Sequence, residues 1–251
     1  MFVVAIAALG RPVDQEILPL ASDIGVTPYE AGLLLRGAMP IVALRTDDKA
    51  RAIALLGQLR ARGHDAVAVD VANVISSDAM TPIRAFRFDG EALVVLGANA
   101  VETPVAYAEI VAILRAMHIA RTESVEKEKR NVISIGRAVM TGGVVATKSV
   151  ERETVKRSED REPVIYIFRR DGAPCLLRAN HARYDGLGPE LRATANENVQ
   201  TFIRVLRAHA PNAALDERLL AVKAADTRQL DILASVLATS IARQIHAYRG
   251  T

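Results

Sequence analysis

Between residues 27 and 70 the sequence reads TPYEAGLLLRGAMPIVALRTDDKARAIALLGQLRARGHDAVAVD and alternates helical with extended patterns. Its first helix is marked by Thr27 at the N-cap position, Pro28 at the first helical position and Glu30 three residues after the cap. This spacing is typical of a capping box, in which the Thr and Glu side chains bind free N–H groups of the first turn. The following PIVALR is apolar and β-branched, which predicts a short strand after Pro40.

The strongest helical pattern in the chain is TDDKARAIALLGQLRARGHD. Thr46 or Asp47 is expected to cap this helix, and Gly63 follows its end, where glycine tolerates the left-handed conformation. Helical spacing predicts a buried stripe of Ile53, Leu56 and Leu59, backed by Ala52 and Leu55. The apolar run Phe2–Leu9 and the alternating DAVAVD are expected to be strands. With a short helix predicted before Gly25, the order is strand, helix, helix, strand, helix, strand.

This order over residues 2 to 70 resembles the C-terminal domain of the bacterial ribosomal stalk protein. That family also has a helix ending in a small, Pro-containing turn, then a short strand, a polar-capped helix, and a Gly before the last strand. Its members recruit translation factors through a lysine-rich helical surface. The corresponding surface here carries Arg36, Lys49, Arg51 and Arg60 and lacks the lysine cluster. The resemblance therefore implies the architecture and leaves out the translational role.

Beyond residue 80 the sequence becomes rich in strand patterns, with three predicted hairpins. Asp89-Gly90 and Asp171-Gly172 each join two strand-like runs, and Thr141 with Gly142-Gly143 joins another pair. Asp-Gly is a strong hairpin signal, because Gly takes the positive φ that a tight turn needs. The run VIYIF is apolar on both faces, which predicts a central strand. From residue 82 to 211, these strands closed by one amphipathic helix resemble a bacterial pleckstrin-homology-like domain. Such domains bind proteins or lipid head groups and are rarely catalytic.

Two segments between the hairpins have other patterns. Residues 104–120, PVAYAEIVAILRAMHIA, carry apolar side chains at helical spacing and predict a helix, although the first part of this segment also tolerates a strand. Residues 121–130, RTESVEKEKR, contain one apolar residue, Val125. This charged tract is expected to be an exposed helical extension or a linker within the β-rich domain.

The chain returns to helical patterns near its end. Thr194 and Glu197 have capping-box spacing ahead of an apolar stripe that stops before Pro211. From about Asp226 to Tyr248, one face carries Leu230, Leu233, Leu237, Ile241 and Ile245. This last helix is expected either to dock on the β-rich domain or to pair with a second subunit in a homo-oligomer.

Together the patterns predict an α+β protein in three parts. These are an N-terminal α/β module at residues 1–75, a β-rich domain at residues 82–211 with the charged insertion near 121–130, and a C-terminal helical segment at residues 212–251. Half of the residues are hydrophobic, which suffices for a real core and argues against disorder.

The composition also bears on the cellular setting. The single Cys175 rules out an internal disulfide and fits a reducing compartment. The apolar amino-terminal run is too short to span a bilayer and lacks the basic start of a secretory signal. No later segment reaches about 18 consecutive apolar residues. We therefore expect a cytoplasmic, soluble protein with no transmembrane segment.

Motifs for catalysis, cofactors or metals are weak. GGVVATKS lacks the glycine that a phosphate loop needs before its lysine. Cys175 and His181 would lie about 20 Å apart on a regular strand, too far for a nucleophile and its base. The five histidines have no metal-ligand spacing, and the acidic Glu159, Asp160 and Glu162 are expected in a solvated loop. We predict no catalytic residue, no cofactor and no metal.

Arginines around the third hairpin form the predicted binding site: Arg169, Arg170, Arg178, Arg183 and Arg192. If the strands pair across Asp171-Gly172, several of these side chains would share one positive face. The alternative is an ordinary solvated edge, where arginine also discourages strand-to-strand aggregation.

The charge distribution leaves three functional hypotheses. Residues 1–120 carry 10 Lys and Arg against 13 Asp and Glu, a net of −3, and residues 121–251 carry 22 against 16, a net of +6. The first hypothesis is a non-enzymatic interaction or regulatory protein that holds a protein partner through its first module or its arginine-rich hairpin. The second is a nucleic-acid-binding protein that uses the basic half. The third is an enzyme whose site assembles only in three dimensions.

Overall fold

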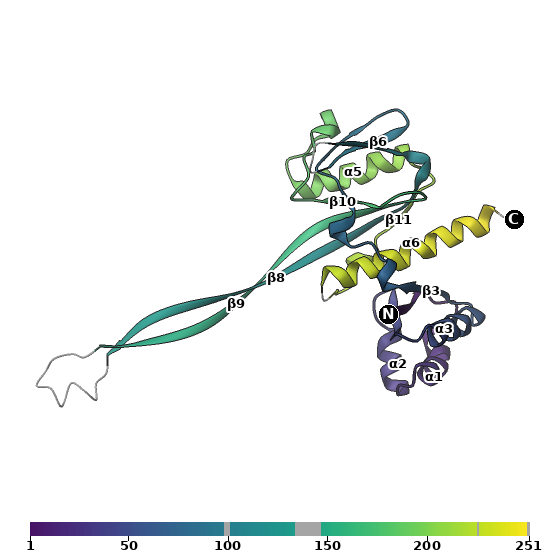
Figure 1. Cartoon of the computed structure of the whole chain (residues 1–251), viewed down its shortest axis with the longest axis horizontal. Coiled ribbons are helices and arrows are strands. Elements are labelled where there is room, and N and C mark those ends of the chain that lie inside the picture. Colours follow the sequence, from purple (N-terminus) through teal and green to yellow (C-terminus); the bar gives the residue numbers. More distant parts are fainter. Residues whose placement is uncertain (98–100, 134–146, 225, 250–251) are drawn as a thin grey trace, which may run out of the picture. The chain divides into compact units, whose positions relative to one another are not determined.

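The computed structural model describes the backbone of residues 1–97, 101–133, 147–224 and 226–249, and the side chains of these residues outside 119–160 and 248–249. Helices and sheets are both present, which confirms the α+β class (Figure 1). The chain divides into two compact units. One comprises Met1–His118 with Glu162–Thr251, and the other comprises Ile119–Arg161.

The N-terminal module has the predicted order of elements. They are β1 (Phe2–Ala8), α1 (Val13–Ile24), α2 (Pro28–Leu35), β2 (Ile41–Thr46), α3 (Lys49–Ala61) and β3 (Asp65–Asp70). The three strands form an antiparallel sheet in the order β2-β1-β3. Buried apolar side chains of α1, α2 and α3 pack against this sheet, led by Leu20, Leu35 and Leu59.

The helix caps of this module follow the sequence closely. The capping box at Thr27 and Glu30 is present, with Glu30 N–H donating to the Thr27 hydroxyl over 3.2 Å. Helix α3 is capped by Asp48, one residue later than expected, because its carboxylate accepts from two N–H groups of the first turn. The prediction that Ile53 is buried was wrong: this side chain is 56% exposed, and Ala52, Leu55 and Leu59 form the buried stripe.

The remaining elements build two further sheets. Strands β5 (Ala85–Phe88), β6 (Ala92–Leu96) and β7 (Glu102–Ala106) form one antiparallel sheet. The other has the order β11-β8-β9-β10-β4, made of β4 (Thr81–Pro82), β8 (Ile110–Ile133), β9 (Thr147–Arg169), β10 (Cys175–Arg178) and β11 (Ala214–Asp216). The helices are α5 (Ala195–His209) and α6 (Thr227–Arg249), and short 3-10 turns are η1 (Val71–Asn73), η2 (Ser77–Ala79), η3 (Tyr107–Glu109), η4 (Asp185–Glu190) and η5 (Arg218–Leu220).

Two of the predicted hairpins are confirmed. Strands β5 and β6 pair across Asp89-Gly90, and β9 and β10 pair across Asp171-Gly172, where Gly172 has a φ of +91°. The predicted turn at Thr141 and Gly142-Gly143 lies outside the described residues. The VIYIF run lies in β9 between β8 and β10, which confirms a central strand.

Two predictions for residues 104–130 were wrong. Residues 104–120 do not form a helix: they contribute to β7, η3 and β8. Ala112, Ile113 and Leu114 are all fully buried, so both faces of β8 are covered and its continuous apolar run imitates helical spacing. The charged tract 121–130 belongs to strand β8, so it is neither a helical extension nor a linker.

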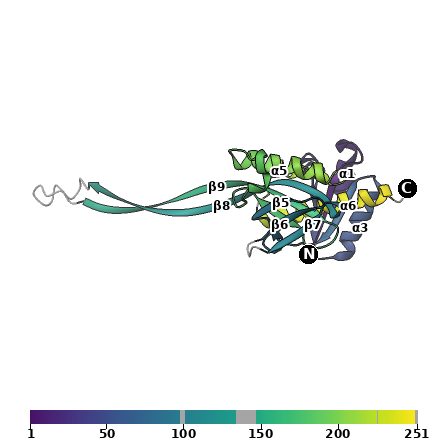
Figure 2. The ribbon, with the colours of Figure 1, turned by 90° about the horizontal axis from the view of Figure 1, so that it is seen from above.

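The five-stranded sheet has a core on each face, because successive strand residues point to opposite sides. Ile113 of β8 and Ile165 of β9 pack with α5 and with strands β5 to β7. Leu114 and Tyr166, one residue further along each strand, pack with α6. Figures 1 and 2 both place α5 beside β5, β6 and β7, in agreement with these contacts.

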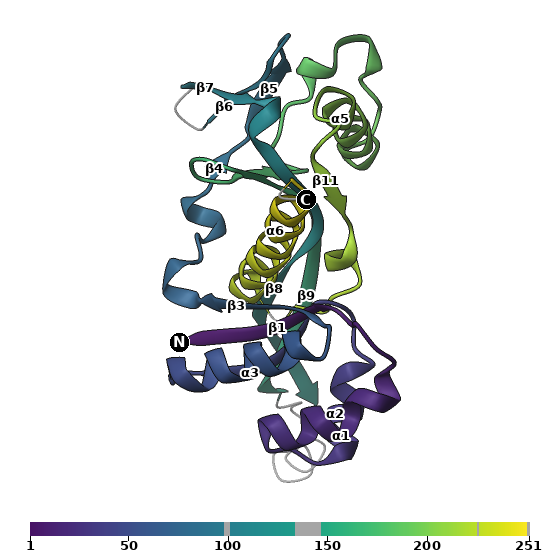
Figure 3. The same cartoon turned by 90° about the vertical axis from the view of Figure 1, so that its right-hand side faces the viewer.

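Helix α6 is buried by its own chain on two sides (Figure 3). Leu233 and Leu237 of its predicted stripe pack against the five-stranded sheet, which confirms docking on the β-rich domain. Ile232 and Val236 pack against β1 and β3 of the N-terminal module. No helix in the described ranges combines the length and apolar composition that crossing a membrane requires.

A candidate binding cavity beside the last helix

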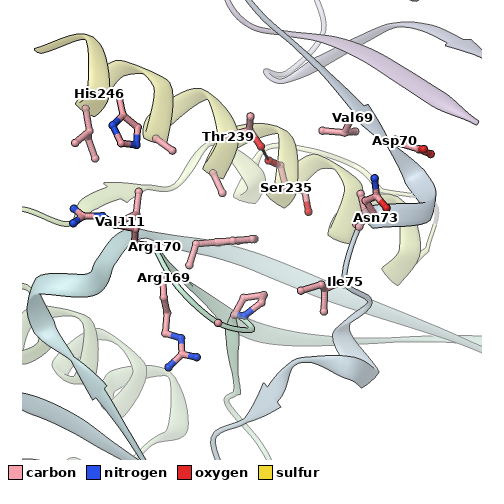
Figure 4. A pocket seen from close by; sticks show the side chains of 17 residues that line it. Val69, Asp70, Asn73, Ile75, Val111, Arg169, Arg170, Ser235, Thr239 and His246 are labelled. Carbon is pink, nitrogen blue, oxygen red and sulfur yellow. Dashed lines mark hydrogen bonds between the residues drawn. The ribbon is translucent and has the colours of Figure 1, made fainter. Parts of the chain in front are cut away.

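A cavity of about 500 Å³ lies in the first unit between α6, the segment from β3 to η1, and the β9–β10 turn (Figure 4). Its volume falls within the range of about 300–1,000 Å³ typical of small-molecule sites. Three stretches that are remote in sequence supply its walls, namely residues 69–75, 168–174 and 235–246, together with Val111 of β8. The fold therefore assembles this cavity only when α6 docks.

The walls of the cavity are largely apolar. They include Val69, Val74, Ile75, Val111, Phe168, Pro174, Ala238, Ala242 and Ile245. Ala238 and Ala242 leave space here because they are the small residues of α6 one turn apart on the side that faces the cavity. Such a lining favours an apolar ligand, because apolar surface gains free energy on leaving water.

Polar side chains lie mainly at the two ends of the cavity. His246 and Arg170 lie at one end in Figure 4, and Asp70 and Asn73 lie at the other. Asp70 already accepts a hydrogen bond from Ala72 N–H over 3.1 Å. In the wall between the ends, the Thr239 hydroxyl donates to the Ser235 carbonyl over 2.8 Å, so α6 satisfies that hydroxyl internally.

Arg169 borders the cavity and packs on the turn. A Cβ atom at Gly172 would lie 2.0 Å from an Arg169 Nη atom, so a larger residue would displace this guanidinium, and the φ of +91° also favours glycine. Within the described part of the chain, Arg169 Nε is buried and has no hydrogen-bond partner. Figure 4 shows the Arg169 side chain directed away from α6, so it lies at the border of the cavity while Arg170 and His246 lie at its end.

The structure brings together only two of the five predicted arginines. Arg169 and Arg170 both line the cavity. Arg178 pairs with Val164 at the far end of β10, whereas Cys175 pairs with Ile167 near the turn. Three residues separate the two pairs, so Arg178 lies roughly 10 Å along the strand from Cys175. Arg183 and Arg192 are exposed beyond the end of β10. Pairing across Asp171-Gly172 therefore occurs without producing a single arginine face.

Arg178 belongs to a separate cluster around Glu162. Glu162 was expected in a solvated loop, but it lies in β9 and is 6% exposed. Its carboxylate accepts from Arg178 over 2.9 Å, from the Asn180 N–H over 2.9 Å, and lies 2.8 Å from His181 Nδ1. Burial raises the pKa of Glu162, but these hydrogen bonds outweigh that effect and leave the pKa below its usual value. The cluster is thus internally paired.

A second buried polar cluster joins α6 to the five-stranded sheet. Asp231 accepts from the Ser77 N–H over 2.9 Å and from the Tyr166 hydroxyl over 3.0 Å, and His118 Nε2 lies 2.9 Å from the same hydroxyl. Burial is the main reason why the pKa of His118 is lowered and that of Tyr166 is raised, so both are held neutral. Ser77 bonds to Asp231 and not to His118, unlike the serine of a hydrolytic triad.

Cys175 is buried, and burial raises the pKa of its thiol, which keeps it unreactive. Among the residues whose side chains are described, no group of three His, Cys, Asp or Glu side chains is arranged to hold a metal ion.

The sequence patterns did not predict the cavity walls formed by α6 and by residues 69–75. The only signal in those stretches was a helix with apolar residues on more than one face.

Comparison of the chain with protein-family models, with curated proteins and with solved structures finds no match.

Proposed function

We propose that this protein is a non-enzymatic binding protein whose cavity beside α6 holds an apolar ligand or an apolar group of a partner. The observation that carries the proposal is the cavity itself, because it combines a ligand-sized volume with mostly apolar walls. The clusters with catalytic residue types lie elsewhere and have their hydrogen bonds satisfied internally, which favours binding over chemistry.

A cavity-filling substitution tests the proposal. Ala242→Phe adds a ring to the cavity wall and should abolish binding of the fluorescent probe 1-anilinonaphthalene-8-sulfonate, an anion with an apolar ring system. Ala247→Phe provides the matched control, because Ala247 lies on the same helix, is exposed, and does not line the cavity. The proposal fails if the native protein gives no saturable fluorescence increase, or if both variants bind the probe as the native protein does.

A nucleic-acid partner has less support. Among the described side chains of the basic half, four arginines are paired with carboxylates: Arg178, Arg204, Arg218 and Arg243. A paired arginine contributes little field to attract phosphates, so these four side chains add little to a phosphate-binding surface. Filter binding of single- and double-stranded DNA at rising salt concentration tests this alternative.

A second candidate function is binding of a protein partner by the helices of the first module. Leu18 of α1, Tyr29 and Leu33 of α2, and Ile53 of α3 are all more than half exposed. Tyr29 and Leu33 are four residues apart and therefore share one face of α2. The stalk domain that this module resembles also binds through its helices, although its surface is lysine-rich and this one is apolar. Loss of a native-lysate partner in Tyr29→Ser/Leu33→Ser, with retention in Ala242→Phe, would assign the partner to this face.

The oligomeric state, the location and the fold of the second domain are further parts of the proposal. A homo-oligomer through α6 has less support, because the apolar stripe of this helix packs against its own chain. The single buried cysteine supports a cytoplasmic location. The resemblance of residues 82–211 to a pleckstrin-homology-like domain is supported by the strands followed by one amphipathic helix.

A further inference from the structure

We infer, on the basis of the proposed binding function, that the cavity takes a single-chain amphiphile: an unbranched apolar chain with an anionic carboxylate or phosphate head group. The head group binds at the Arg170 and His246 end, and the chain runs along α6 toward Ser235. Four features of the cavity support this assignment.

The first feature is the length of the cavity. Its α6 wall extends from Ser235 to His246, which corresponds to roughly 16 Å of helix at about 1.5 Å per residue. A volume of about 500 Å³ spread over this length makes the cavity elongated. An extended alkyl chain matches these proportions better than a compact ring system or a lipid with two chains.

The second feature is the apolar surface between the ends. Val111 and Phe168 line the sheet side, and Ala238, Ala242 and Ile245 line the α6 side. The Thr239 hydroxyl, which also borders this stretch, already donates to the Ser235 carbonyl. A methylene chain would therefore bury its surface here without costing the Thr239 hydroxyl its partner.

The third feature is the cationic Arg170 side chain, which has no carboxylate partner among the described residues. Among the side chains that the structure describes, no carboxylate lies within ion-pair distance of Arg170, Arg169 or His246. This contrasts with Arg178, which Glu162 holds at 2.8 Å. The Arg170 backbone N–H donates to the Glu109 carbonyl over 2.8 Å, so the base of this residue is fixed. Its guanidinium remains available for a charged head group, which it can bind with two parallel hydrogen bonds.

The fourth feature is the polarity of the cavity. Asp70 lies at the end opposite Arg170 (Figure 4). This carboxylate lies 3.9 Å from the Met1 ammonium group, so the charges at that end balance each other and give an anion no net attraction. The two ends therefore give the ligand one preferred direction, with its anionic head away from β3.

Isothermal titration of the full-length protein tests the inference with three probes below their micelle concentrations: dodecanoate, dodecyl phosphate and dodecanol. We expect both anions to bind more tightly than the neutral alcohol, and the tighter of the two anions identifies the head group as carboxylate or phosphate.

Arg170→Gln should weaken anion binding about tenfold, since a hydrogen bond to a charged group contributes about that factor. The same variant should leave dodecanol binding unchanged. Arg183→Gln, at an exposed arginine outside the cavity, is the matched control and should bind all three probes as the native protein does.

The outcomes separate the inference from the proposed function. If dodecanol binds as tightly as dodecanoate and Arg170→Gln alters neither, the cavity still binds apolar ligands, but the anionic head group is refuted. If none of the three probes binds and anilinonaphthalene sulfonate also fails, the proposed function is refuted as well. Circular dichroism and the thermal midpoint of Arg170→Gln should match the native protein, because the substituted side chain is exposed.

Discussion

The Tyr166 hydroxyl donates a hydrogen bond to Asp231 Oδ1 over 3.0 Å, and this bond joins the central strand β9 to α6 within the core. Asp231 is only 1% exposed, and the backbone and side chain of Ser77 also donate to its carboxylate. One buried acid thus holds together three segments that are remote in sequence. Since α6 forms one wall of the cavity, this polar contact also fixes the position of that wall.

Tyr166→Phe should destabilise the protein by about 1–3 kcal/mol. The substitution keeps the ring packing but removes a donor to the buried Asp231 and the partner of His118, and unsatisfied buried polar groups cost about that much. Urea unfolding at neutral pH measures the effect. Tyr29→Phe is the control, because Tyr29 is 75% exposed, and it should change stability by less than about 0.5 kcal/mol. Equal stabilities of the two variants would contradict the structural role of the Tyr166 hydroxyl.

His118 should make the protein less stable as the pH falls from 7 to 5. Burial lowers its pKa first, and Arg178 lowers it further, while Asp231, Glu162 and Asp78 oppose the shift in part. The unfolded chain therefore takes up a proton near the ordinary pKa of about 6.5 when the folded chain does not, so stability is complete above that pH and declines below it. His118→Gln should flatten this slope.

Unfolding free energies of the native protein and of His118→Gln, measured between pH 5 and 7.5, provide the comparison. This range lies above the region where carboxylates with lowered pKa values, such as Glu162, titrate. Identical slopes for the two proteins would show that the pKa of His118 does not differ between the folded and the unfolded chain.

Local signals in the sequence predicted the elements whose ends are fixed by neighbouring residues. The capping boxes at Thr27 and Thr194 and the turns at Gly90 and Gly172 all depend on contacts within a few residues. Such features are visible in a short window because the side chain and its backbone partner are close in sequence.

The sequence was misleading where burial on two sides removes periodicity. Strand β8 is covered on both faces, so its apolar residues show no alternation and were read as helical.

The cavity could not be predicted from the sequence for a different reason. Arg170 and His246 are 76 residues apart and meet only because α6 docks on the β-rich domain. Arg169 and Arg170 were predicted as binding residues. The apolar walls around them come from distant stretches of the chain and could not be predicted.

Glu16→Gln should cost about 3–5 kcal/mol, the amount typical of removing one partner of a buried ion pair. Glu16 is fully buried and accepts hydrogen bonds from Arg62 over 2.8 Å and from Arg11, while His64 Nε2 lies 2.9 Å from it. Burial raises its pKa, but these donors lower it below the usual value, so the stability it contributes is present above about pH 4.5 and is lost in acid.

Urea unfolding at pH 7 and at pH 4 checks both statements about Glu16. Glu91→Gln serves as the control at an exposed carboxylate and should stay within about 0.5 kcal/mol of the native protein. A loss at pH 7 no larger than that of the control would mean that the arginine and histidine cluster is not maintained by Glu16.

Gly10→Ala and Gly57→Ala should change stability in opposite directions. A Cβ atom at Gly10 would lie 2.0 Å from the Gly63 carbonyl oxygen, so the chain after β1 would have to move away and break the 3.0 Å hydrogen bond from Gly10 N–H to His64 Nδ1. Overpacking of this kind costs about 1–3 kcal/mol, and the lost hydrogen bond adds to it. Gly57 lies within α3 with nothing within 4 Å of the added atom, so alanine there should gain up to about 1 kcal/mol from helix propensity.

Thermal unfolding tests both substitutions. We expect the midpoint of Gly10→Ala to lie below that of the native protein and the midpoint of Gly57→Ala to lie above it. A midpoint for Gly10→Ala equal to that of the native protein would mean that Gly10 and Gly63 are not packed as closely as described.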